Sequence, residues 1–110
     1  MKEEEYFVRV PISLLRDNTL SRSALIVYAI LLDKAKDFGS FGGCELTIGE
    51  IAKWSGLSEH TVRRSERQLV DAGYLEIERT GRASVLVIKK YGIHIQSYSA
   101  INAYRKVKEG

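Results

Sequence analysis

The segment 46–75 constrains the fold most strongly, because it holds the start and stop signals of two helices separated only by a short turn. Thr47 and Glu50 have the spacing of a capping box, in which two side chains bond free backbone N–H groups of the first helical turn. The pattern predicts a short helix from Ile48 to about Ser55, and Gly56 ends it.

A second helix is predicted directly after this break. The Ser58 hydroxyl can accept a hydrogen bond from a free amide of the first turn. The helical pattern continues to Ala72 and stops at Gly73, which suits a left-handed C-terminal cap. We therefore expect a helix over residues 58–72, joined to the first one by the short turn Gly-Leu-Ser.

After Gly73 the hydrophobic period changes from that of a helix to that of a strand. Apolar and polar residues alternate over residues 74–79, as on a strand with one buried face. Residues 80–83 predict a tight turn, and residues 84–90 predict the returning strand of a hairpin. Two helices joined by a short turn and followed directly by a hairpin form the plan of a winged helix-turn-helix.

A longer apolar helix is predicted before this unit. Ser21 can cap its first turn, and apolar residues over 24–32 fill most of the helix circumference. We expect this helix to end near Phe38 and Gly39, where glycine again suits a cap, and residues 39–43 to form a loop.

The flanking segments complete the predicted organisation. Residues 6–10 predict a short extended piece, residues 12–16 a turn of helix, and residues 97–108 a final helix. The predicted parts are an N-terminal extended segment over 1–20, a winged helix-turn-helix domain over 21–90 and a C-terminal helical tail over 91–110. The fold class is mostly α with a small β hairpin (α+β): three core helices, a two- or three-stranded wing and a C-terminal helix.

Composition agrees with a small domain that has an anionic partner. The chain has 110 residues and a formal net charge of +3, which favours nucleic acid or an anionic surface as partner. The single cysteine, Cys44, excludes an intrachain disulfide, and the longest apolar run is far shorter than the ~20 residues that cross a bilayer. The first residues lack the pattern of a signal peptide, so we expect a cytoplasmic protein without a membrane partner.

Residues 51–64 followed by residues 69–75 resemble bacterial winged-helix DNA-binding domains. Ala52 is small where the two helices cross, Gly56 suits the positive φ of the turn, and Val62 packs the second helix on the first. The resemblance implies binding of double-stranded DNA, with residues 58–72 as the helix that enters the major groove.

The N-terminal half carries a second resemblance. Residues 7–11, 20–21 and 24–33 are similar to the N-terminal winged-helix domains of plasmid and phage replication initiators, which open with a short strand ending in proline and a Leu-Ser-capped apolar helix. This implies sequence-specific DNA binding as a replication-initiator-type domain. Two alternatives stay open: a transcriptional repressor of the same fold, and a winged helix used for protein–protein contact.

The second helix of the motif has a basic face. At ~100° per residue, the four basic side chains fall opposite the core-facing Val62 and Leu69: His60, Arg63, Arg64 and Arg67. An arginine fork can pair bidentately with guanine, and the motif points its first turn, Ser58, Glu59, His60 and Thr61, at base edges. The alternative is that the arginines only solvate an exposed helix and pair with acidic neighbours.

The hairpin turn is the second predicted DNA contact. Arg79, Thr80 and Arg82 place two guanidinium groups around a tight turn, where a wing touches the DNA backbone or minor groove. The alternative is an exposed turn that carries arginine for solubility.

Two carboxylates depart from the pattern. Glu66 lies about 40° from Val62 around the helix, where an aliphatic residue is more typical, so it must reach solvent or a cation. Arg22 and Lys53 are candidate partners. Glu59 either stabilises the helix start or accepts a hydrogen bond from cytosine N4.

The remaining predictions concern partners and chemistry. The stripe Tyr98, Ile101 and Tyr104, or the exposed side of Trp54, is a candidate homodimer surface; packing on the domain itself is the alternative. Tyr28, Phe38 and Phe41 are predicted core aromatics. No metal-ligand spacing, nucleotide loop or nucleophile–base set can be assembled from two histidines and one thiol, so we expect no enzyme activity, cofactor, metal or small-molecule ligand.

Overall fold

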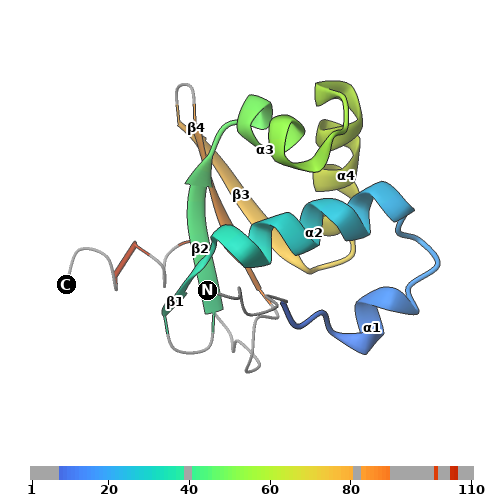
Figure 1. Ribbon diagram of the computed structural model, residues 1–110. Coiled ribbons are helices and arrows are strands. Elements are labelled where there is room, and N and C mark those ends of the chain that lie inside the picture. Colours follow the sequence, from blue (N-terminus) through green and yellow to red (C-terminus); the bar gives the residue numbers. More distant parts are fainter. Residues whose placement is uncertain (1–7, 39–40, 81–82, 90–100, 102–104, 107–110) are drawn as a thin grey trace, which may run out of the picture.

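A computed structural model of the chain describes residues 8–38, 41–80, 83–89, 101 and 105–106. The helices of these ranges are α1 (Ile12–Leu15), α2 (Arg22–Lys34), α3 (Ile48–Ser55) and α4 (Glu59–Asp71). The strands are β1 (Lys36–Phe38), β2 (Phe41–Leu46), β3 (Leu75–Thr80) and β4 (Ala83–Ile88). They form an antiparallel sheet in the order β1-β2-β4-β3, and Figure 1 shows these helices on one side of it. The predicted α+β winged-helix class is confirmed.

Local capping interactions set the helix boundaries where the sequence predicts them. Ser21 Oγ accepts a hydrogen bond from the Ala24 N–H at 3.2 Å and begins α2. The capping box of α3 is complete, because the Glu50 N–H donates to Thr47 Oγ1 at 3.0 Å and the Thr47 N–H donates to Glu50 Oε1 at 2.9 Å. The short helical turn predicted after Pro11 is present as α1.

The segment after α2 differs from the prediction. The helix ends at Lys34 rather than near Phe38, with Ala35 extended at a ψ of 150°, and the chain continues directly into β1. The loop expected over residues 39–43 is wrong from residue 41 onward, because this stretch begins β2 and pairs with both β1 and β4. Pairing with β4 gives these residues backbone partners from a distant part of the chain, which a local pattern cannot reveal.

The predicted wing is therefore part of a larger sheet with two distinct faces. Cys44, Leu86 and Ile77 are cross-strand neighbours on the face toward the helices, where Cys44 and Leu86 belong to the buried core. The adjacent row on this face joins Ser84 to Arg79 and therefore directs an arginine of β3 toward α4.

The opposite face of the sheet contacts C-terminal residues. Val87 points away from the helices and is nevertheless buried. Ile101, also buried, donates its backbone N–H to Glu76 Oε1 at 2.9 Å, and Arg105 forms an ion pair with Glu78. Ile101 thus packs on its own domain, which was the alternative to a dimer contact for this residue.

The terminal predictions are described only in part. Residues 8–10 form no regular strand, and residues 6 and 7 lie outside the described ranges. Of the final helix predicted over 97–108, residues 101, 105 and 106 are helical and the others lie outside those ranges.

Candidate nucleic-acid interface

Burial divides α4 into the two sides that the sequence predicts. The buried side chains of the helix are Val62, Ser65, Glu66 and Leu69. The exposed basic side chains are His60, Arg63, Arg64 and Arg67. The predicted basic face therefore exists, and it lies opposite the core.

The turn between α3 and α4 has the geometry that the resemblance implies. Gly56 has a φ of 78°, a conformation that strains other residues, and its N–H donates to the Ala52 carbonyl at 2.9 Å. Ser58 Oγ accepts from the Thr61 N–H at 3.1 Å and donates to Thr61 Oγ1 at 2.9 Å. The predicted cap is confirmed, and the two hydroxyl groups of this first turn are bonded to each other.

A contact that the sequence analysis missed fixes the second half of α4. Gln68 Oε1 accepts hydrogen bonds from both the N–H and the hydroxyl of Ser21, each at 2.9 Å. The bonds join α4 to the cap of α2, which lies 47 residues earlier in the chain. A glutamine at an intermediate position carries no periodic signal, so no sequence pattern could have found this link.

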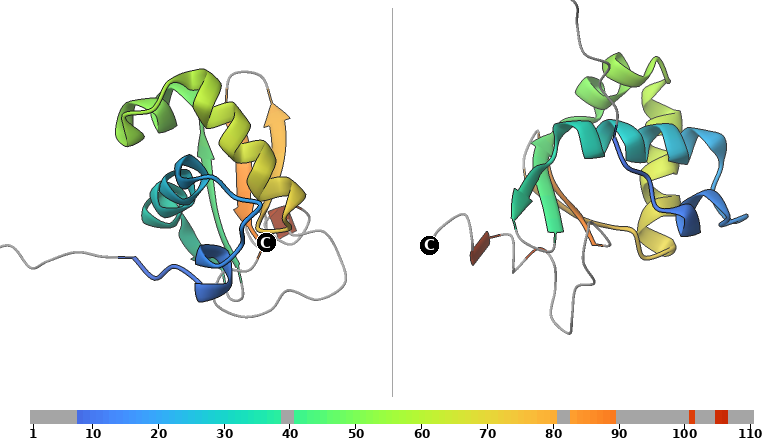
Figure 2. Two further views of the ribbon diagram at one scale, coloured as in Figure 1. Left: turned by 90° about the vertical axis from the view of Figure 1, so that its right-hand side faces the viewer. Right: turned by 60° about the horizontal axis from the view of Figure 1, so that its bottom comes forward.

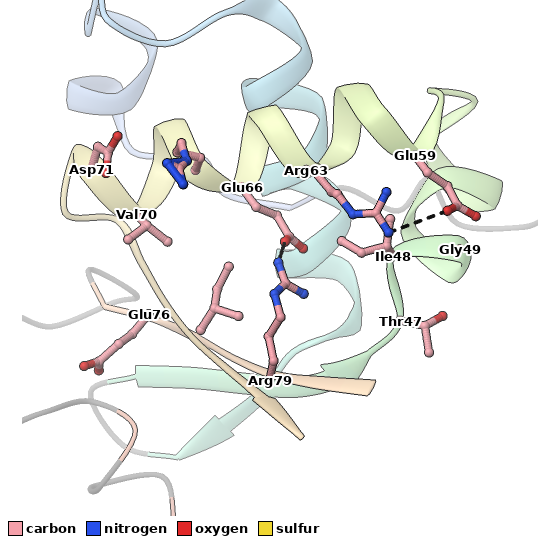
Figure 3. Close-up of a pocket in the computed structure, with 12 residues that line it drawn as sticks. Thr47, Ile48, Gly49, Glu59, Arg63, Glu66, Val70, Asp71, Glu76 and Arg79 are labelled. Atoms are coloured by element: carbon pink, nitrogen blue, oxygen red, sulfur yellow. Dashed lines mark hydrogen bonds and ion pairs between the residues drawn. The ribbon is translucent and has the colours of Figure 1, made fainter. Parts of the chain in front are cut away.

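A groove of about 920 Å³ separates α4 from β3 and from the start of α3 (Figure 3). Its charged lining residues are three arginines and four carboxylates: Arg63, Arg67, Arg79, Glu59, Glu66, Asp71 and Glu76. Arg63 and Arg67 belong both to this lining and to the basic face of α4, and the carboxylates of the lining offset their charge on the groove side.

The exposed edge of the groove holds a loose ion pair. Arg63 Nη2 lies 3.9 Å from Glu59 Oε1, and the two side chains are 59% and 58% exposed. Pairs of this kind contribute about 0–1 kcal/mol to stability, so Arg63 can exchange its partner for another anion at little cost. Glu59 also lies at the N-terminus of α4, where a negative charge is favourable, which agrees with its helix-stabilising interpretation.

The floor of the groove holds a buried ion pair. Glu66 is 1% exposed, and its Oε1 accepts a hydrogen bond from Arg79 Nη2 at 3.0 Å. The candidate partners Arg22 and Lys53 are wrong, because the alternation of β3 directs Arg79 toward α4 while those two side chains remain exposed. The expectation that Glu66 must reach solvent or a cation is confirmed.

Burial dominates the acid–base properties of this region. It raises the pKa of the Glu66 carboxyl above its usual value, and the hydrogen bond from Arg79 opposes the shift without cancelling it. Burial also raises the pKa of the Cys44 thiol to about 12, with the charges of Glu66 and Glu45 adding to the shift. Cys44 is buried, and its thiol is protonated at neutral pH.

Of the three predicted wing residues, only Arg79 has a described side chain. Arg79 lies inside β3, and its 54% exposed side chain leans toward α4 rather than surrounding the turn. Thr80 ends β3, with its side chain outside the described set, and Arg82 lies outside the described residues altogether. Figure 2 (left) shows α4 running beside β3, with β3 ending on the side where α4 begins.

The predicted aromatic core and dimer surfaces are described in part. Tyr28 is fully buried and meets the Tyr74 ring edge-on, with centroids 6.1 Å apart. Trp54 is 40% exposed, and Lys34 Nζ lies 4.3 Å from its ring centroid. The side chains of Phe38 and Phe41, and residues Tyr98 and Tyr104, lie outside the described set.

The described ranges hold neither a membrane-spanning helix nor a cluster of metal ligands. No helix in them is long and apolar enough to cross a bilayer. They also contain no group of three or more His, Cys, Asp or Glu side chains that could hold a metal ion.

Comparisons with known proteins agree with this geometry. No curated protein matches the sequence. A solved structure of the reduced (Fe(II)) CO-sensing protein from R. rubrum is similar at a TM-score of 0.50 and 24% identity, over 69% of this chain and 36% of that one. This chain thus spans about a third of that protein's length, and the likeness concerns the fold alone. The model of the helix-turn-helix domain family matches residues 18–75, more than half of the chain, so the chain belongs to the helix-turn-helix domain family.

Proposed function

We propose that the chain binds double-stranded DNA in a sequence-specific manner, with α4 as the helix that enters the major groove. The observation that carries this proposal is the basic face of α4. Within the described ranges, Arg64 and Arg67 form no ion pair, and Arg63 forms only the loose pair with Glu59. These guanidinium groups are held in a row by a well-capped helix and are available to an anionic partner.

The chemistry of arginine suits both parts of DNA recognition. A guanidinium pairs bidentately with guanine O6 and N7 or with phosphate oxygens. The first turn of α4, which this motif directs at base edges, holds the exposed Ser58, Glu59 and His60 and the half-buried Thr61. Arg79, Thr80 and Arg82 of the β3–β4 hairpin are the proposed wing contacts with the DNA backbone or minor groove.

The decisive test is duplex binding by variants of the basic face. Arg64→Ala combined with Arg67→Ala should weaken duplex binding about 10- to 100-fold and lower the slope of log affinity against log salt by about two. Arg16→Ala removes an exposed arginine beside α1 and serves as the charge control. Fluorescence anisotropy over a salt series measures both quantities, and equal affinities for the double variant and wild type would overturn the proposed role of α4.

Within DNA binding, we propose replication initiation of a plasmid, phage or mobile element ahead of transcriptional repression. The N-terminal resemblance over residues 7–11, 20–21 and 24–33 supports this order, and the family match is compatible with either role. Selection of bound sequences from a random duplex pool separates them. Tandem direct repeats would support the initiator role, and a palindrome would support a dimeric regulator. No enrichment would favour a winged helix that contacts an acidic protein.

A further inference from the structure

The Arg79 guanidinium forms hydrogen bonds with two side chains on different elements. Its Nη2 donates to Glu66 Oε1 of α4 at 3.0 Å, and its Nη1 donates to Ser84 Oγ of β4 at 2.8 Å. Arg79 and Ser84 face each other in the register of β3 and β4. Figure 3 shows Glu66 and Arg79 pointing toward each other across the groove. The network therefore fixes the guanidinium relative to both the helix and the hairpin.

The network is exposed at one end only. Glu66 has a side chain that is 2% exposed, whereas that of Arg79 is 54% exposed. A guanidinium has five N–H donors in a rigid planar fork, and the two bonds leave three of them. Among the described residues Arg79 makes no further hydrogen bond, and more than half of its side chain is exposed, so the remaining donors are available to an anion at the rim of the groove.

Stability alone is a poor explanation of this arrangement. A buried ion pair is often replaced by apolar residues without loss of stability, because desolvation of the charges offsets their attraction. Glu66 Oε2 is buried and has no hydrogen-bond partner among the described residues, and burial raises the pKa of this carboxyl. An aliphatic side chain beside Val62 and Leu69 would fill the position without these costs.

We propose that Glu66 is a positioning residue for DNA binding: it holds the Arg79 guanidinium at the rim of the groove so that the free N–H donors meet a phosphate while α4 lies in the major groove. The inference rests on the duplex binding proposed above. Because the side chain is ordered before DNA arrives, less rotamer freedom is lost on binding. The same bonds keep the hairpin and α4 at one spacing, so both contact the duplex together.

The sign of the effect of Glu66→Leu distinguishes positioning from simple electrostatics. Removal of a negative charge near phosphate should tighten binding, whereas release of Arg79 should weaken it. Asp71→Asn is the matched control, because Asp71 is a carboxylate on the same helix and in the same groove, with no ion pair in the described ranges.

The experiment measures affinity of the full chain for a selected duplex over a salt series. We expect Arg79→Gln to weaken binding about 10-fold and to lower the salt slope by about one. Glu66→Leu should weaken binding about 3- to 10-fold, with unchanged or higher thermal stability, and should weaken it no further in the Arg79→Gln background. Asp71→Asn should bind as tightly as wild type or more tightly.

A spectroscopic readout and a second variant guard against loss of folding. The Arg79 side-chain N–H signals in nuclear magnetic resonance should be sharp in wild type and broadened in Glu66→Leu. If Glu66→Leu does not fold, the isosteric Glu66→Gln replaces it and should lose part of the affinity. Glu66 variants that bind like Asp71→Asn, with an unchanged salt slope, would overturn the positioning role while duplex binding stands. Wild type without salt-dependent duplex binding would overturn both proposals.

Discussion

Helix α4 carries two glutamates that each meet an arginine, and the two pairs differ in the burial of the glutamate and in the distance between the charged groups. Glu59 and Arg63 are more than half exposed and 3.9 Å apart, so solvent and salt screen their attraction. Glu66 is buried, and its 3.0 Å bond to Arg79 joins the helix to the hairpin. The exposed pair can give its arginine to another anion at little cost, whereas separation of the buried pair would leave a charge without compensation. The same pair of residue types is therefore exchangeable at the exposed edge of the groove and structural at its floor.

The largest expected difference comes from removing the arginine of each pair. Arg79→Ala leaves the Glu66 carboxylate buried without its partner and should lower the free energy of unfolding by about 3 kcal/mol at neutral pH. Arg63→Ala, the matched variant of the exposed pair, should change the free energy of unfolding by less than about 0.5 kcal/mol. Denaturant titration measures both values. Similar losses for the two variants would abolish the distinction between the pairs.

A smaller effect is expected from the cap that begins the helix carrying both pairs. Ser58→Ala removes the hydroxyl that accepts from the Thr61 N–H and should cost about 1 kcal/mol of unfolding free energy. Ser58→Asp keeps a capping acceptor and should retain most of that stability. If Ser58→Ala were neutral in the same titration, the start of α4 would depend on the turn at Gly56 alone.

The pH dependence of the unfolding free energy tests the burial of the Glu66 carboxyl. Because the pKa of Glu66 is raised on folding, the folded state holds this proton more tightly than the unfolded state, whose model value is 4.5. Wild-type stability should therefore fall, relative to Glu66→Gln, as the pH rises from about 4.5 through the raised pKa. Unfolding free energies of both proteins at several pH values test the sign, and a constant difference would contradict the assigned burial.

The smallest effect is expected for the carboxylate of the exposed pair. Glu59→Gln should lower stability by about 0.5 kcal/mol, through loss of both its ion pair and its charge at the helix N-terminus. The loss should shrink in high salt, because exposed charges are screened. A loss that persisted in high salt would show that Glu59 is less exposed to screening than its pair geometry indicates.

The features that sequence predicts in this chain are those that neighbouring residues determine. The capping box of Thr47 and Glu50 and the cap at Ser58 depend on residues three positions apart, and Gly56 acts through its own backbone. For the same reason α3 and α4 appear within a residue of their predicted bounds. The basic face of α4 follows from helix geometry once those bounds are known.

The features that sequence misses depend on residues far apart in the chain. Strand β2 exists because Gly42 to Leu46 pair with β4. The residues around β2 carry no local pattern that indicates this partner. The helical pattern shows that Glu66 stands where an aliphatic residue is more typical. Its partner is known only once the register of β3 places Arg79 opposite α4. Long-range pairing decides these positions, and local periodicity carries no information about it.

The order of the strands also affects how copies of the protein behave at high concentration. β4 holds the consecutive apolar run Val85 to Ile88, a segment of the kind that drives edge-to-edge aggregation when exposed. It lies between β2 and β3, so both of its backbone edges are already paired. The outer strands of the described sheet are β1 and β3, and on β3 Glu76, Glu78 and Arg79 interrupt the apolar residues and oppose the addition of a foreign strand. The apolar strand β4 thus has β2 on one edge and the charged β3 on the other, which should keep copies of the protein from joining through the β3 edge at high concentration.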